Sequence, residues 1–222
     1  MPTRLQIRNW VRAETLVEST MMSDADINAI IDQAVRDVST RFNWPFLAKT
    51  DTIAFVLNQQ EYTLPTDFDR LVAVMVDGTT TKLTEVGPAE YWAAYGDSPP
   101  SGTPAYFFLW ANQIFVSPVP TASTGGLVLR YFRAPTLMTD DAHVPEFASQ
   151  FHMILAEYAS LHLWHREEDF SKARVYEERY LDGVERMARY YLGRAIDAPL
   201  VMGGGMPRRS APSDAWRFPF FP

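Results

Sequence analysis

The sequence predicts an α+β fold: an antiparallel helical bundle with an inserted antiparallel β module and an extended C-terminal tail. Apolar residues recur at helical spacing near both ends of the chain, which is typical of amphipathic helices. Between these regions they alternate with polar residues, as in half-buried strands. The boundaries divide the chain into a first helical part (1–48), the β module (49–136), a second helical part (137–194) and a C-terminal arm (195–222).

The composition is that of an ordered globular protein. Of the 222 residues, 47% are hydrophobic, which is enough for a substantial core. The formal net charge of -7 disfavours a protein that grips nucleic acid through a basic surface. Because there is no cysteine, disulfides and thiolate metal sites are excluded. A fold of this size without disulfides fits the cytosol. There is no apolar run of about 18 residues and no apolar leader, so we expect neither a membrane span nor a signal peptide.

The first helical part contains two predicted helices. Residues 3–17 form a modest candidate with a loose apolar face. Ser23 opens a clearer helix, because its side chain can accept a hydrogen bond from a free amide of the first turn, and Asp26 follows three residues later. Apolar residues recur at helical spacing through 27–42, so this helix packs by one stripe.

The segment 43–47 (Asn-Trp-Pro-Phe-Leu) ends that helix. The residue before a proline is driven out of the α region, so Pro45 marks the boundary. We expect Trp44 and Phe46 to fill the joint between the helical and β parts.

The β module begins with a predicted strand at 51–57. A polar turn follows, and we expect 61–64 to return as the partner of that strand. Residues 70–76 are rich in β-branched side chains and predict a buried strand. Asp77-Gly78 is a hairpin signal, so we expect 79–83 to pair back on that strand.

The rest of the module is a short helix and three more strands. Pro88 suits a first helical turn, which predicts a helix at 88–95. Residues 105–110 and 113–117 form a predicted hairpin, and 127–133 is the last strand.

Helices resume near Pro145. The apolar residues from Phe147 to Trp164 cover almost the whole circumference of the first of them, which predicts a largely buried helix. The next helix runs to about Leu192. Its solvent-facing side carries ion pairs between residues four positions apart, such as Asp182 and Arg186.

Two histidines, His162 and His165, have a spacing that a zinc site could use. No Glu follows the first in a His-Glu-x-x-His pattern, so surface or interface histidines are the favoured interpretation and no metal is expected. The glycines at 203–205 lack the Lys-Ser/Thr of a phosphate loop, and we expect no cofactor.

Two acidic pairs, Asp67/Asp69 and Asp140/Asp141, resemble the paired carboxylates of a glycosidase. Both lie in predicted turns, where Asp is common because its side chain bonds the local backbone. No neighbouring feature in the sequence raises the pKa of a carboxylate in either pair. We therefore expect these aspartates to stabilise turns, and we expect no enzyme activity.

The aromatic residues of the β module leave a second function open, that of a carbohydrate-binding protein. The candidates for a sugar-binding face in the β module are Tyr91, Trp92, Tyr95, Tyr106, Phe107 and Trp110. A nucleic-acid-binding protein needs a basic stripe, whereas the arginines of the last helix alternate with acids. A core role is the default for aromatics in strands.

The C-terminal arm ends in large apolar side chains that are costly to leave in water. Aromatic residues and arginine are enriched at interface anchors, so binding to another chain is favoured over folding back. The candidate binding residues are Arg208, Arg209, Trp216, Arg217, Phe218, Phe220 and Phe221.

Five segments, taken in order, resemble the head-to-tail adaptor (connector) proteins of tailed bacteriophages, especially those of short-tailed phages. They are the helix at 28–38, the Asn-Trp-Pro-Phe-Leu of 43–47, the Gln-Glu-Tyr-Thr-Leu-Pro that opens 60–68, the Ser-Gly-Thr-Pro that opens 101–107, and the Tyr-Phe-Arg of 131–135. The resemblance reaches Leu192 and leaves out the arm.

The resemblance implies a structural protein of the virion neck, without catalysis, that is assembled in the host cytoplasm. Such adaptors form a ring, expected to be a dodecamer, beneath the capsid portal. The ring extends the DNA channel, through which DNA passes without specific binding, and it offers a docking surface to tail or nozzle proteins. In related adaptors the C-terminal segment reaches the portal, so the resemblance assigns the arm residues to portal binding.

Overall fold

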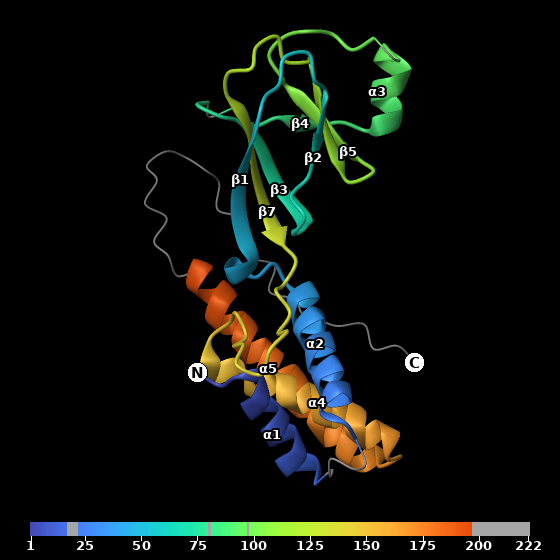
Figure 1. The fold of residues 1–222 in the computed structure, drawn as a ribbon, viewed down its shortest axis with the longest axis vertical. Coiled ribbons are helices and arrows are strands. Elements are labelled where there is room, and N and C mark those ends of the chain that lie inside the picture. Colours follow the sequence, from blue (N-terminus) through green and yellow to red (C-terminus); the bar gives the residue numbers. More distant parts are fainter. Residues whose placement is uncertain (17–21, 80, 97, 197–222) are drawn as a thin grey trace.

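The computed structural model describes residues 1–16, 22–79, 81–96 and 98–196. These residues form an elongated molecule with helices at one end and two β-sheets at the other (Figure 1). The α+β class predicted from the sequence is therefore confirmed.

Four long helices make up the helical end: α1 (Arg4–Thr15), α2 (Asp24–Arg41), α4 (Met153–Arg166) and α5 (Phe170–Ile196). Helix α4 contacts the other three, and its residues from Ile154 to Ser160 are buried except for Glu157. The prediction of a helix buried almost all round is confirmed at this position.

Capping explains where the first two helices begin. The Thr3 hydroxyl accepts from the Gln6 amide, and the Gln6 side chain accepts from the Thr3 amide, which is a complete capping box. The Ser23 hydroxyl accepts from the Asp26 amide at 3.2 Å, as predicted. Helix α2 ends at Arg41, and a short 3-10 turn, η1 (Pro45–Leu47), leads into the first strand.

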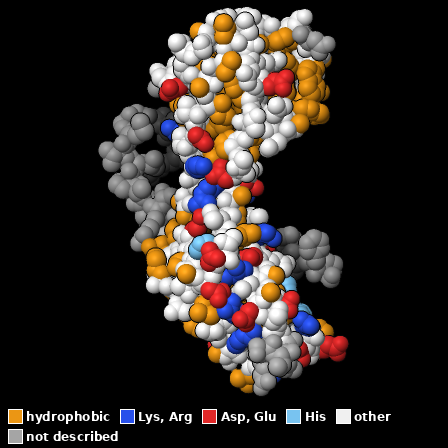
Figure 2. All heavy atoms as spheres, in the orientation of Figure 1, with side chains coloured by type: hydrophobic (Ala, Val, Ile, Leu, Met, Phe, Trp, Pro, Cys, Tyr) orange, Lys and Arg blue, Asp and Glu red, His pale blue; other side chains and the backbone are white. Residues whose placement is uncertain are grey.

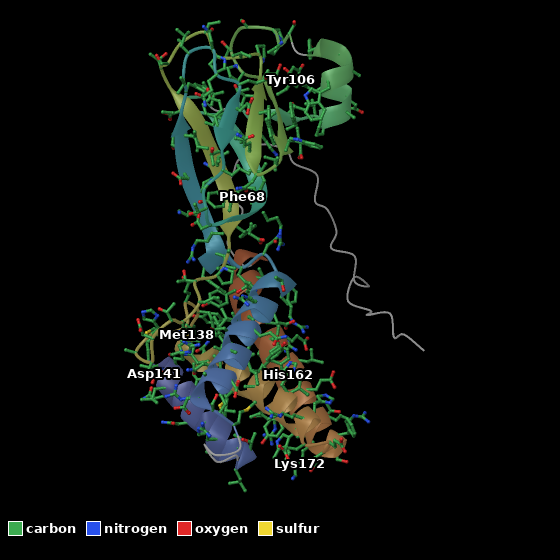
Figure 3. The ribbon with its side chains drawn as sticks, turned by 45° about the vertical axis from the view of Figure 1, so that its right-hand side comes forward. Phe68, Tyr106, Met138, Asp141, His162 and Lys172 are labelled. Atoms are coloured by element: carbon green, nitrogen blue, oxygen red, sulfur yellow. The ribbon has the colours of Figure 1, made fainter. Side chains whose placement is uncertain are left out.

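A row of arginines holds α1 in place. Arg4 donates to Asp32 of α2 at 2.9 Å, and Arg8 makes a bidentate pair with Asp141 at 2.8 and 2.9 Å. Asp141 lies beside α1 on the connection that follows the β module (Figure 3). The Asp141 carbonyl also accepts from the Leu5 amide, so this connection satisfies an amide in the first turn of α1.

The β end contains seven strands and one short helix, all within the described residues. The elements are β1 (Ala48–Ala54), β2 (Glu61–Thr63), β3 (Phe68–Val76), β4 (Thr84–Glu85), α3 (Pro88–Tyr95), β5 (Tyr106–Trp110), β6 (Gln113–Ser117) and β7 (Gly126–Arg133). The predicted helix at 88–95, the hairpin of β5 and β6, and the last strand are confirmed.

The strands form a three-stranded sheet in the order β1-β7-β3 and a four-stranded sheet in the order β2-β6-β5-β4. The prediction that 61–64 pairs with the first strand is wrong, because β2 joins β6 in the other sheet. The module is also not wholly antiparallel, since β4 runs parallel to β5. The expected pairing of 79–83 is reduced to a bridge between Lys82 and Met75 and one bond from the Leu83 amide to the Val74 carbonyl.

The second helical part begins later than predicted. Helix α4 starts at Met153, after a 3-10 turn, η2 (Ser149–Phe151), and not near Pro145. The Ala148 amide donates to the Tyr191 hydroxyl at 2.8 Å, so a side chain of α5 holds this segment outside the helix. Helix α5 extends to Ile196, beyond the expected end near Leu192.

Two hydrophobic clusters fill the two ends. The helical cluster is centred on α2 and α4, with Ile31, Val38 and Leu155 fully buried. The β cluster lies between the two sheets and includes Ile114, Leu127 and Leu129. The two clusters share no residue, so the ends of the molecule have separate cores.

The contact between α4 and α5 gives a stability prediction. A Cβ at Gly183 of α5 would lie 2.8 Å from Cγ1 of Ile154, whereas a Cβ at Gly193 of the same helix meets nothing within 4 Å. We expect Gly193→Ala to stabilise the protein by up to about 1 kcal/mol, because alanine favours a helix. Gly183→Ala should be less stable than Gly193→Ala by about 1–3 kcal/mol because of overpacking. Chemical denaturation measures both; equal effects would contradict the close approach.

Candidate interaction surfaces

The joint between the two ends is built on Trp44. Its side chain is fully buried, and the indole N–H donates to the Val38 carbonyl at 2.6 Å. Its ring contacts Phe42 and Tyr191 edge-on and stacks on Phe46. Phe132 of β7 packs against the same cluster, so the joint is filled from both sides as predicted.

A polar network surrounds this joint on the β side. Lys49 of β1 donates to Asp67 at 2.8 Å, and the Tyr131 hydroxyl of β7 donates to the other oxygen of Asp67 at 2.8 Å. The hydrogen bond from Lys49 is the main cause that lowers the pKa of Asp67 below its usual range. Arg70 of β3 donates to the Asn43 side chain, which links the sheet to the segment after α2.

Three of the four aspartates predicted to lie in turns do so, at a turn or bend, whereas Asp69 belongs to strand β3, so the prediction is wrong for Asp69. Asp67 is held by Lys49, and Asp69 lies 3.6 Å from Arg70. The hydrogen bond from Arg8 lowers the pKa of Asp141. A general acid at neutral pH needs a raised pKa, so the environments of Asp67 and Asp141 fit structural roles.

The two histidines of α4 differ in environment. His162 is half-buried against the Tyr158 ring, and burial lowers its pKa, with a further contribution from His165. His165 is exposed and lies against Phe170. Among the described residues, no group of three or more histidine or acidic side chains is arranged to hold a metal.

An aromatic face covers the outer side of the four-stranded sheet and α3. Its exposed members are Trp92, Tyr95, Tyr106 and Trp110. Hydrophobic side chains gather over this side of the β end (Figure 2), and Tyr106 points toward α3 (Figure 3). Phe108 connects the members, since it contacts Tyr91 and Trp92 and stacks on Phe115 at 4.7 Å.

The geometry of the aromatic face bears on the carbohydrate alternative. Trp92 and Trp110 meet edge-on, with an interplanar angle of 84°. Sugar binding by stacking needs ring faces that are open together, whereas this arrangement gives a rough apolar surface. Aromatic anchors of this kind are enriched at protein–protein interfaces. The face therefore favours contact with a polypeptide.

A shallow groove of about 540 Å³ lies at the opposite end of the molecule, where α5 begins. Trp164 and Tyr176 line it, and the Lys172 ammonium lies 3.9 Å from the centre of the Trp164 ring. Lys172 marks this end of the helices in Figure 3. The molecule thus presents apolar surface at both ends of its long axis.

The predicted portal-binding residues lie outside the described part of the chain. They belong to 197–222, so their assignment remains a prediction. These residues are Arg208, Arg209, Trp216, Arg217, Phe218, Phe220 and Phe221.

A comparison with models of protein families shows to which family the chain belongs. The model of the SU10 adaptor protein family matches residues 4–203. The chain belongs to the SU10 adaptor protein family. This result confirms the resemblance to phage head-to-tail adaptors and identifies a structural adaptor protein of a phage virion. A comparison with curated proteins gave no match.

The family match spans both helical parts, the β module and the first residues of the arm. It extends further than the resemblance seen in the sequence, which reached Leu192. None of the helices in the described residues combines the length and the hydrophobicity that a membrane span requires.

Sequence reasoning missed the arginine row of α1 and the Lys49–Asp67–Tyr131 network. The spacing of Arg4, Arg8 and Arg12 places all three on one helix face, and this pattern was an available signal. Their acidic partners are distant in sequence, so the pairs could not be assigned.

The adaptor also contains a buried histidine that makes its stability depend on pH. His152 has no exposed surface, its Nε2 lies 2.8 Å from the Phe147 carbonyl, and burial lowers its pKa. The unfolded chain therefore takes up a proton first, and stability is lost as pH falls below about 6.5. His162 acts in the same direction.

We expect the free energy of unfolding to fall between pH 7 and pH 5 by at most about 1.4 kcal/mol per pH unit for each histidine. His152→Gln should reduce this slope, because it removes the titrating group and keeps an N–H donor. The matched control is Met153→Gln, at the exposed neighbouring position, which changes no titrating group and should leave the slope unchanged. Urea denaturation at several pH values measures it; a slope unaffected by His152→Gln would contradict this assignment.

Proposed function

We propose that this chain is a head-to-tail adaptor that forms a ring, expected to be a dodecamer, between the capsid portal and the tail. The ring extends the DNA channel, and DNA passes through it without specific binding. The protein is assembled in the host cytoplasm and resides in the neck of the virion. The observation that carries this proposal is the family match over residues 4–203.

The two ends of the molecule have different roles in the proposed ring. The helical part (1–48 and 137–194) and the β module (49–136) act as separate building blocks around the Trp44 joint. The aromatic face of the β module offers a surface to tail or nozzle proteins, since exposed apolar clusters mark contact sites. No catalytic step is involved.

The charge of the chain supports a channel that does not hold DNA. The formal net charge is -7, and strong attraction to phosphates needs clustered lysine and arginine. Along α5, Arg186 and Arg189 pair with Asp182 and Glu185, so their charges are balanced locally. We expect channel-facing positions to be acidic or neutral overall.

The ring is tested by mixing the full chain with the portal ring of the same phage and imaging the product by negative-stain electron microscopy. We expect portal particles that carry an additional ring. A portal that stays bare at micromolar concentrations of both proteins would contradict the proposal. The protein alone is not a sufficient test, because the portal could act as a template for assembly.

The arm (195–222) is proposed to bind the portal through its aromatic and arginine side chains. Deletion of residues 197–222, which leaves every described residue in place, should abolish or strongly weaken binding to the portal in a pull-down. Thermal unfolding of the deletion variant should match that of the full chain. Unchanged portal binding by the truncated protein would refute the role of the arm.

A further inference from the structure

The three-stranded sheet has two open margins. In its strand order, β1 and β3 are the outer strands, with β7 between them. Among the described residues, no strand pairs with the outer edge of β1 or with that of β3 between Phe68 and Ala73. Natural proteins usually cover or disrupt such edges, because unpaired backbone groups attract another strand.

The β1 edge is regular and suited to pairing. All seven residues from Ala48 to Ala54 pair with β7 without a register shift, and the strand contains no proline. Thr50 and Thr52 are exposed β-branched residues, which fit a pleated surface. Asp51 accepts a hydrogen bond from the Thr52 amide but has no ion-pair partner among the described residues.

A groove of about 320 Å³ lies beside the other margin. Its walls are residues 71–73 of β3 on one side, and 82–85 and Phe107 on the other. Val72 falls at a register shift, has no partner in β7 and is 50% exposed. Lys82 is exposed at the groove, and no ion pair involving it exists within the described residues.

The pairing register places residues on the outer edges of β1 and β3 at the same level along the strand direction. Asp51 of β1 lies opposite Leu129 of β7, which lies opposite Val74 of β3. The Val74 carbonyl accepts from the Leu83 amide, so Lys82 lies near the same height. Since β1 and β3 both run antiparallel to β7, they run parallel to each other.

Rotation about an axis along the strands keeps each residue at its height. In a ring with that axis, Asp51 of one copy therefore comes to the level of Lys82 of the next copy, with opposite charge. A closed ring of identical subunits needs two different, complementary patches on each subunit. The two margins of this sheet meet that requirement.

We propose that residues 48–50 of β1 of one copy lie in the groove beside residues 70–73 of β3 of the next copy, parallel to them, and that this contact joins neighbouring subunits of the ring. The pairing stops before Val74, where Leu83 already covers the edge of β3. The inference rests on the proposed ring function and names its interface. The occupant of the groove is a second copy of this chain, because the second copy supplies an unpaired edge of the correct direction and a carboxylate at the height of Lys82.

Engineered disulfides test this contact, since the natural chain has no cysteine. Thr50 and Ala73 both lie opposite Arg130 of β7, so they share one level and one face. On adjacent strands their Cα atoms would lie about 5 Å apart, which suits a disulfide. The variant is Thr50→Cys with Ala73→Cys in the full chain. The controls are the two single variants and Thr50→Cys with Thr63→Cys, which lies in the other sheet.

Rings are assembled on the portal, oxidised, and analysed by microscopy and by non-reducing electrophoresis. We expect a ladder that extends beyond the dimer for Thr50→Cys/Ala73→Cys and at most dimers for the controls. Rings without a ladder, or an equal ladder from the control pair, would overturn this interface while leaving the ring proposal intact. Absence of rings would overturn both.

A charge exchange provides a second test that needs no oxidation. Asp51→Lys and Lys82→Asp should each reduce the yield of rings about 3- to 10-fold by placing like charges together. The double variant should recover most of the yield, because the opposite charges meet again between copies. Circular dichroism confirms folding of each variant. Single variants that assemble normally would contradict the proposed pairing of these two side chains.

Discussion

Burial of the Trp44 indole at the joint is the interaction on which the arrangement of the molecule depends. The helical and β clusters share no residue, and within the described residues the chain passes between the two ends at the segment before β1 and at the segment after β7. Trp44 fills the first passage, and Phe132, next to the second, packs against the same cluster. Because Pro45 follows directly, the chain leaves α2 at a fixed place and the tryptophan enters the core there.

Magnitudes indicate that aromatic packing, more than the charged network, fixes the joint. Truncation of a buried Trp or Phe typically costs about 3–5 kcal/mol, whereas an exposed ion pair contributes about 0–1 kcal/mol. Lys49, Asp67 and Arg70 are all partly open to solvent. Their role is therefore to select one orientation of the sheet on the helices, because these hydrogen bonds form only when the donor and acceptor side chains face each other. An adaptor that presents surfaces at two distant ends needs such a defined orientation.

Much of the fold could be predicted because its signals are local. The Ser23 cap, the apolar stripe of α2, the break at Pro45 and the hairpin of β5 and β6 each lie within a few residues of sequence. The partner of residues 61–64 could not be predicted, because strand pairing depends on contacts distant in sequence. The start of α4 was missed for a similar reason, since Tyr191 holds Ala148 from another helix.

For the candidate sites too, the residues could be named from local sequence, whereas their partners could be found only in the structure. The absence of a raised pKa at Asp67 and Asp141 agrees with the turn roles predicted for them, although the partners Lys49 and Arg8 are visible only in the structure. Of the six aromatic candidates named from the sequence, four are exposed, whereas Tyr91 and Phe107 are buried, and the edge-on packing of Trp92 and Trp110 was not predicted. The portal-binding residues of the arm lie beyond the described chain and stay a prediction.

Electron cryomicroscopy of the intact virion tests the central claim most directly. We expect a ring in the neck, directly below the portal, into whose subunit density the helical part and the β module fit, joined at Trp44. Density for this fold elsewhere in the particle, such as in the tail fibres or the capsid shell, or a neck without it, would contradict the account.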